Sequence, residues 1–179
     1  SLIAANELGL STNEIKITST DTEKVPNTSA SAASASTDIN GAAVVNAIDK
    51  IKKNLALFIN KNFNYKGKLI EYKNNKVYYG NKSIDFKKII SLAYLNRVQL
   101  SSSGFYKTPK IFVNKKTLKG RPFLYFCYGA AVSEIIIDTL TGENKLVQVD
   151  ILHDAGKAIN PALELGQIEG GFVQGQGWL

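Results

Sequence analysis

Glycine is concentrated in the last 19 residues of this 179-residue chain, and no other feature restricts the fold as strongly. Pro161 suits the first turn of a helix and Asn160 precedes it as an N-cap, so a helix is predicted to begin there. Each glycine in a helix interior costs about 0.5 to 1 kcal/mol relative to alanine. We therefore expect something to pack very closely against the helix backbone at five glycines, which are Gly166, Gly170, Gly171, Gly175 and Gly177.

A second unusual segment, from Thr18 to Gly41, consists mainly of Ser, Thr and Ala. It leads directly into Ala42 to Phe58, where apolar residues recur at helical spacing, and Thr37 and Asp38 stand where an N-cap belongs. Two interpretations remain open on the residues alone. The run is either a low-complexity linker or a buried segment that turns into a helix and presents free N–H groups to an anion. In the second case the hydroxyls would come from Ser31, Ser34, Ser36 and Thr37.

The remaining pattern predicts short elements of both kinds. Residues 1–9 are expected to end a helix at Gly9, and a helix is predicted from Asp85 to Asn96. Strands are predicted at Glu14–Thr18 and within 68–86, where Asn74-Asn75 and Gly80-Asn81 form turns on what we expect to be a surface hairpin. A long antiparallel hairpin is predicted from Phe123–Thr139 and Lys145–Asp154.

These elements together predict an α+β fold of two layers, helices on mainly antiparallel sheet pieces. We divide the chain into residues 1–60, with the small-residue segment and the following helix; 61–121, a variable Lys-rich hairpin, helix and connection; and 122–179, a β-hairpin with the Gly-rich helix. No apolar window is long enough to span a membrane and the first residues lack a charged-then-apolar pattern, so we expect neither a membrane span nor a secretory signal. A cytoplasmic location is expected.

The net charge of +7 comes from the middle of the chain. Residues 49–122 carry 18 Lys plus Arg against three acids, whereas the segments on either side are net acidic. Sixteen of these 18 cations are Lys, and recognition of phosphates and bases usually uses Arg. We expect a solvated basic surface, with a nucleic-acid-binding module as the less favoured alternative.

Single side chains carry little chemistry by themselves. Gln167 could bond the edge of an amide or pterin-like ring, because its carboxamide offers a donor and an acceptor, or it could simply face solvent. His153, beside Asp154, has no evident nucleophile partner, and Cys127 is expected to be a small buried hydrophobe. Glu134 and Asp138 are expected to share one face of a strand as surface acids, so we assign no metal ligand.

The chain has no methionine and begins Ser1-Leu2-Ile3, which we interpret as a piece of a longer polypeptide.

Three blocks resemble the molybdenum-binding part of the xanthine dehydrogenase family, the bacterial large subunit in particular. They are VPNTSASAASASTDINGAAV (25–44), SSSGFYKTP (101–109) and the stretch from PFLYFCYGAAVSEIIIDTLTGE to GQIEGGFVQGQGWL (122–179). The blocks follow the family's order and cover about two thirds of the chain, whereas residues 60–100 are less informative.

The resemblance implies which residues bind the cofactor. Ala32 and Ala33 would approach the molybdenum end, and Ser34, Ser36 and Thr37 would bond the pterin phosphate or its neighbourhood. Gln167, in GQIEGG, matches a glutamine that bonds the pterin. The family's catalytic glutamate lies in a GVGEP-type motif that does not occur here, so we assign no catalytic residue and expect this polypeptide to be inactive alone.

The resemblance also implies an activity and partners for the intact protein. It would oxidise hypoxanthine and xanthine to urate with oxygen from water, using a molybdenum–molybdopterin cofactor. Electrons would leave through 2Fe-2S clusters and FAD, on a partner subunit or domain, to NAD. The intact protein is expected to be a heterotetramer or a dimer of heterodimers. An aldehyde-oxidase-like molybdenum hydroxylase remains the alternative enzyme.

Overall fold

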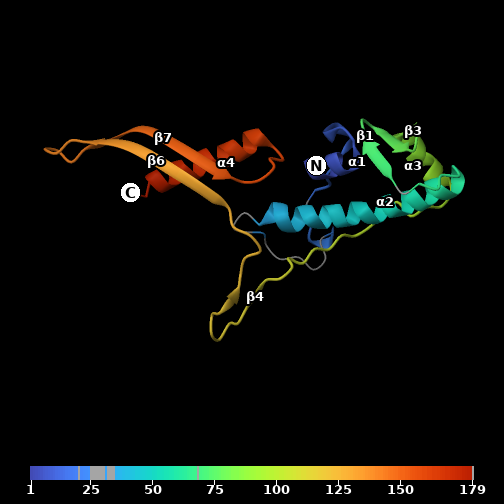
Figure 1. Ribbon diagram of the computed structural model, residues 1–179, viewed down its shortest axis with the longest axis horizontal. Helices are drawn as coiled ribbons and strands as arrows, with labels where there is room; N and C mark the ends of the chain where they lie inside the picture. The colour runs from blue at the N-terminus through green and yellow to red at the C-terminus, as the bar shows by residue number, and fades with distance from the viewer. Residues whose placement is uncertain (20, 25–30, 32–34, 68, 179) are drawn as a thin grey trace. The chain divides into compact units, whose positions relative to one another are not determined.

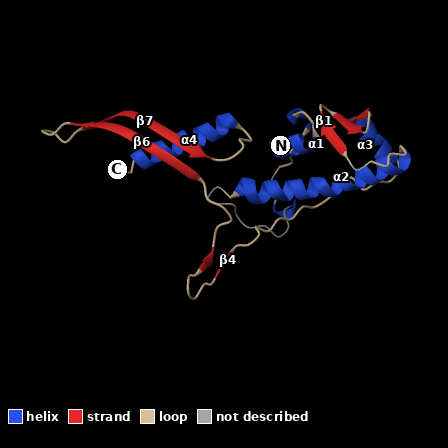
Figure 2. Cartoon of the chain, in the orientation of Figure 1, coloured by secondary structure: helices blue, strands red, loops and turns tan. Residues whose placement is uncertain are grey.

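The computed structural model describes residues 1–19, 21–24, 31, 35–67 and 69–178. The chain divides into two compact units, Ser1–Thr108 and Pro109–Leu179, which we describe separately and call unit 1 and unit 2 (Figure 1). Helices and small antiparallel sheets alternate along the sequence, as Figure 2 shows, so the predicted α+β class is confirmed. The division of the chain into three parts, 1–60, 61–121 and 122–179, stays a prediction.

Unit 1 is built on one long helix, α2 (Ala42–Asn62), and a three-stranded sheet. The strands are β1 (Ile70–Lys73), β2 (Lys76–Tyr79) and β3 (Lys82–Asp85), followed by helix α3 (Phe86–Leu95). In Figure 1 the sheet and α3 gather at the C-terminal end of α2. The core lies there, and its most completely buried large side chains are Leu55, Ile59, Val77 and Ile89.

The sheet forms where the sequence predicts strands, because Asn74 and Asn75 both take the positive φ angles of a tight hairpin turn. Its alternating pattern turns Val77 and Tyr79 inward, and both are buried. The expectation that this Lys-rich hairpin is only surface is therefore wrong for its inner face. Lysine dominates the composition, but every second residue of β2 faces the core.

The N-terminal helix α1 (Leu2–Leu8) ends as predicted at Gly9, whose φ of 62° is left-handed. A side chain at Gly9 would overlap the main chain of Tyr72 and Lys73, so glycine also permits α1 to approach β1. Lys52 on α2 bonds Glu7 at 2.8 Å and lies 5.3 Å from the ring centre of Tyr72. These contacts tie α1 to α2 and β1.

The predicted strand at Glu14–Thr18 is wrong. The structure has a short 3-10 helix, η1 (Thr12–Glu14), followed by irregular chain in which Ile17 is 71% exposed. Alternating apolar residues do not by themselves form a strand, because a strand also needs a neighbouring strand to pair with. Another 3-10 turn, η2, covers Thr22–Lys24.

Helix α2 is preceded without a break by a π-helical turn, η3 (Thr37–Gly41). Thr37 and Asp38 lie inside this turn, so their predicted role as N-cap is wrong. Ser36 takes the cap position in helical conformation, and its side chain makes no cap hydrogen bond. π-turns are rare and occur frequently at functional sites.

Unit 2 contains a two-residue ladder and the long predicted hairpin. The ladder joins β4 (Phe112–Val113) to β5 (Gly120–Arg121), and the hairpin pairs β6 (Tyr128–Ile137) with β7 (Asn144–Asp154). Helix α4 (Pro161–Gln176) follows. No side chain among the described residues of unit 2 is buried, and Cys127 is exposed, so its predicted burial is wrong. Within the part of the chain that the structure describes, no strand pairs with the apolar run around Cys127.

Asp138 organises the turn of the long hairpin. Its carboxylate accepts hydrogen bonds from the backbone N–H groups of Leu140, at 2.8 Å, and Thr141, at 3.2 Å, which lower the pKa of Asp138. Asp138 lies beyond the end of β6, so it does not share a strand face with Glu134 as predicted. Among the described residues, no group of three or more His, Cys, Asp or Glu side chains could hold a metal ion. A search of the described helices finds none that could cross a membrane.

We predict that Leu55→Ala lowers the free energy of unfolding of unit 1 by about 2 to 5 kcal/mol, because Leu55 is completely buried and its loss leaves a cavity. Leu57→Ala is the matched control on the same helix, since Leu57 is 69% exposed. Urea denaturation followed by circular dichroism measures both. Equal effects of the two substitutions would contradict the location of the core.

We also predict that Tyr72 makes unit 1 lose stability at alkaline pH. Burial raises the pKa of Tyr72 to about 12, above the value of about 10 in an unfolded chain, so the neutral form is favoured in the fold. The resulting stability is present below pH 10 and is lost as pH rises towards 12. The hydroxyl has no hydrogen-bond partner among the described residues, so Tyr72→Phe should be tolerated at pH 7. Denaturation from pH 8 to 12 should show a smaller loss for Tyr72→Phe than for the wild type.

Candidate functional site

The start of α4 is fixed by side-chain bonds that set the orientation of Gln167. Asn160 accepts a hydrogen bond from the backbone N–H of Leu163 at 3.3 Å, as an N-cap does. Glu164 accepts in return from the N–H groups of Ile159, at 2.7 Å, and Asn160, at 3.3 Å. The predicted cap and the helix start at Pro161 are therefore confirmed. Gln167 lies less than one turn beyond Glu164.

Glycine and glutamine share one face of α4. Gly170 and Gly171 are three and four residues from Gln167, and four and three from Gln174, so they lie between the two glutamines. Both glutamines are exposed. Outside the neighbouring helix backbone, no described atom lies within 4 Å of the position that a side chain would take at Gly170 or Gly171. The same holds at Gly166 and Gly175, so the close packing expected from the sequence is not made by the described residues of this chain.

This face has the properties that a flat heterocycle requires. The glycines remove bulk over more than one turn, and the two carboxamides at its edge each offer a donor and an acceptor. The opposite side of α4 carries Ile168 and Phe172, which are half-buried. We call the open side that carries the glycines and the two glutamines the Gly/Gln face (Gly166, Gln167, Gly170, Gly171, Gln174).

The small-residue segment is only partly described. The predicted cofactor residues Ala32, Ala33 and Ser34 lie outside the described residues. Ser31 accepts a hydrogen bond from the Asn40 side chain at 3.1 Å. Ser36 and Thr37 are described, and both are exposed at the first turn of the helical stretch η3–α2.

The first turn of a helical stretch carries N–H groups without helical partners and a partial positive charge. Ser36 and Thr37 add hydroxyl donors at that position. This donor set suits an anionic oxygen, so the residues present fit a phosphate group. Ser36 and Thr37, which fit a phosphate, belong to unit 1, whereas Gln167, which fits a ring edge, belongs to unit 2.

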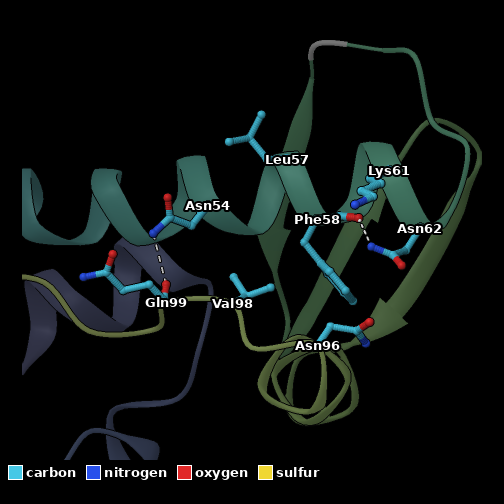
Figure 3. A pocket seen from close by; sticks show the side chains of 8 residues that line it. All are labelled: Asn54, Leu57, Phe58, Lys61, Asn62, Asn96, Val98 and Gln99. Atoms are coloured by element: carbon cyan, nitrogen blue, oxygen red, sulfur yellow. Dashed lines mark hydrogen bonds between the residues drawn. The ribbon is translucent and has the colours of Figure 1, made fainter.

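A hollow of about 360 Å³, lined by both polar and apolar side chains, lies beside the C-terminal half of α2 (Figure 3). The Asn54 side chain donates to the carbonyl oxygen of Gln99 at 3.0 Å, and Asn62 and Asn96 donate to carbonyl oxygens one turn earlier in their own helices. Lys61 is the one cation in its lining. All three side-chain amides thus donate to backbone carbonyl oxygens. The bond from Asn54 joins α2 to the segment that follows α3.

Sequence reasoning missed how α2 holds the segment 99–105. Asn46, Lys50 and Asn54 are four residues apart, so they form one polar stripe, and all three side chains bond this segment. The spacing was visible in the sequence, but nothing local distinguishes such a stripe from a solvated helix face. His153 sits in a hollow lined by Tyr128, Gly129, Ala130, Leu152 and Asp154, without Ser or Cys, which gives it no nucleophile there.

We predict that Glu164→Ala frays the start of α4 and exposes its first turn, because the N–H groups of Ile159 and Asn160 lose their acceptor. Glu164→Gln keeps an acceptor oxygen and should behave nearly as the wild type. Hydrogen exchange of residues 159–167 measures the difference, which we expect to be several-fold in rate. Glu169→Ala, farther along α4, is the control, and an equal effect there would contradict the capping role.

Comparison with known proteins agrees with these features. Residues 1–179 match the family of molybdopterin cofactor-binding domains. The chain is 44% identical to the xanthine dehydrogenase/oxidase of Felis catus over 98% of its length, 45% to that of Gallus gallus and 38% to the xanthine dehydrogenase of Dictyostelium discoideum, also over 98%. It spans 12% of the length of each relative. The chain therefore belongs to the xanthine dehydrogenase family and has the sequence of a molybdopterin cofactor-binding domain.

Proposed function

We propose that this chain supplies contacts to the molybdopterin cofactor of a xanthine dehydrogenase. The observation that carries the proposal is the match of all 179 residues to a molybdopterin cofactor-binding domain. The exposed Gly/Gln face of α4 supports it, because a pterin is a flat ring whose edge carries donors and acceptors. The residues proposed for binding are those implied by the sequence: Ala32, Ala33, Ser34, Ser36, Thr37 and Gln167.

Each described residue has a distinct task in the proposal. Gln167 bonds the edge of the pterin, and the neighbouring glycines let the ring approach the helix backbone. Ser36 and Thr37 bond the phosphate or its neighbourhood, where the N–H groups of η3 neutralise negative charge. The cofactor, when bound, supplies the redox chemistry of the metal. The residues of this chain hold and orient it.

For the intact protein we propose oxidation of hypoxanthine and xanthine to urate, with oxygen from water. Electrons leave through 2Fe-2S clusters and FAD, on a partner subunit or domain, to NAD. The intact protein is proposed to be a cytoplasmic heterotetramer or dimer of heterodimers of the bacterial type. The names of the relatives support xanthine as the substrate over an aldehyde. Three lysines of the basic segment, Lys50, Lys52 and Lys87, donate to oxygen atoms within unit 1, which counts against their use in a nucleic-acid site.

Gln167→Ala in the intact protein is predicted to lower the pterin and molybdenum retained after purification by several-fold, because the ring edge loses both of its bonds. Gln176→Ala is the matched control, since Gln176 is an exposed glutamine of the same helix on its other side. Metal analysis by mass spectrometry and pterin fluorescence measure the content. Equal loss in both variants would contradict the assignment of Gln167.

We expect the 179-residue chain alone to give no xanthine-dependent reduction of NAD, because no residue of the GVGEP motif is present to act as the base. An absorbance assay at the NADH maximum tests this with the intact protein as the positive control. Turnover by the chain alone would show that a residue within it performs the catalytic step.

A further inference from the structure

The segment 99–105 has no regular secondary structure, yet it runs along α2 in a defined position. The side chain of Asn54 donates to the carbonyl oxygen of Gln99 at 3.0 Å, the first of its bonds to α2 (Figure 3). Lys50 Nζ donates to the carbonyl oxygen of Ser103 at 2.8 Å. The N–H of Phe105 donates to Oδ1 of Asn46 at 3.3 Å. The partners on α2 have lower residue numbers as the residue numbers of the segment rise, so the segment runs antiparallel to α2. We call it the strap.

Gly104 brings the strap into direct contact with the helix backbone. A side chain at this position would overlap the carbonyl oxygen of Ala43 and come within 2.9 Å of the Ala47 nitrogen. Ala43 and Ala47 are themselves small and lie one turn apart. The contact therefore depends on small residues on both sides.

The first half of α2 has little other support. Leu55, Phe58 and Ile59, which join the core, all lie in its second half, and Ile48 is the one buried residue of α2 before them. The strap reaches the level of Ala43, two residues beyond the end of η3 at Gly41. Among the described residues, α1, the strap and the hydrogen bond from Asn40 to Ser31 support the helix end at which Ser36 and Thr37 lie.

We infer that Asn46, Lys50 and Gly104 are positioning residues for the cofactor contacts of Ser36 and Thr37, an inference that rests on the proposed function. They act through the helix and touch no cofactor atom. Releasing the strap lets the first turns of α2 move, so that the hydroxyls of Ser36 and Thr37 no longer meet the phosphate together. The core around Leu55 stays in place, because its contacts are made at the other end of the helix.

The test compares variants of the intact protein that remove or keep a single bond. Asn46→Ala and Lys50→Met remove the acceptor and the donor, whereas Asn46→Asp and Lys50→Arg keep them. Lys53→Met is the matched control, an exposed lysine of α2 that makes no bond to the strap among the described residues. Gly104→Ala displaces the strap by its bulk, and the single-bond variants cover the case in which it fails to fold.

Two quantities are measured for each variant: hydrogen exchange at residues 99–106, and the rate at which molybdenum and pterin are lost during incubation. We expect Asn46→Ala and Lys50→Met to exchange several-fold faster and to lose cofactor several-fold faster. Asn46→Asp, Lys50→Arg and Lys53→Met should match the wild type. Rescue by the conservative variants separates the lost bond from a general loss of stability, which the melting temperature reports.

Faster exchange with unchanged cofactor retention would overturn the inference, because the strap would then serve the fold alone. Unchanged exchange would overturn it as well, since the bonds would not hold the strap. A wild-type protein that contains no molybdenum or pterin would instead refute the proposed function, and this inference with it. The wild-type measurement therefore distinguishes the two failures.

Discussion

The burial of one side of α2 against the inner face of β1–β3 and α3 is the contact on which unit 1 depends. Leu55 and Ile59 come from the helix, Val77 from the sheet and Ile89 from α3, and none of the four retains exposed surface. Because this contact occupies the second half of α2, the first half reaches beyond the core. Ser36 and Thr37, which precede this first half, therefore lie away from the sheet. The first half of the helix is supported separately, by α1 and the strap.

Unit 2 is organised by main-chain hydrogen bonds and caps more than by burial. The ladder of β6 and β7 runs from Tyr128 paired with Asp154 to Ile137 paired with Asn144, with a bulge after Glu134. Many apolar side chains on this hairpin stay exposed, Ile136 and Leu152 among them. The capping bonds of Asn160 and Glu164 then define the start of α4, so Gln167 is placed by local geometry and does not depend on a core.

The sequence predicted best what short-range chemistry controls. Gly9 ends α1 because its left-handed φ suits glycine, and Asp85 caps α3 with a bond to the N–H of Lys88. The Asn74-Asn75 turn sets the register of β1 and β2, because both asparagines take the positive φ angles of a tight turn. Two predictions that depended on contacts with residues far away in the sequence were wrong. The strand predicted at Glu14–Thr18 has no pairing partner in the described part of the chain, and Cys127 was expected to be buried although nothing among the described residues covers it. For the candidate site, the residues alone left Gln167 open between a ring contact and a solvent-facing amide. The family resemblance implied the pterin contact, which stays a prediction, whereas the capped start of the Gly-rich helix is a local signal that the structure bears out.

By itself the sequence determined the end of α1 at Gly9, the Asn74-Asn75 turn and the capped start of α4, and it indicated the family to which the chain belongs. These depend on caps, turns, residue spacing and motif order, all of which act over a few residues. Only the tertiary structure decided that the Lys-rich hairpin supplies Val77 and Tyr79 to the core, and that the glycines of α4 share an open face with Gln167 and Gln174. It also decided that the strap lies along α2, through bonds between residues that are 45 to 59 positions apart in the sequence. Such contacts join residues far apart in the chain, so their energy appears only when the backbone has brought them together.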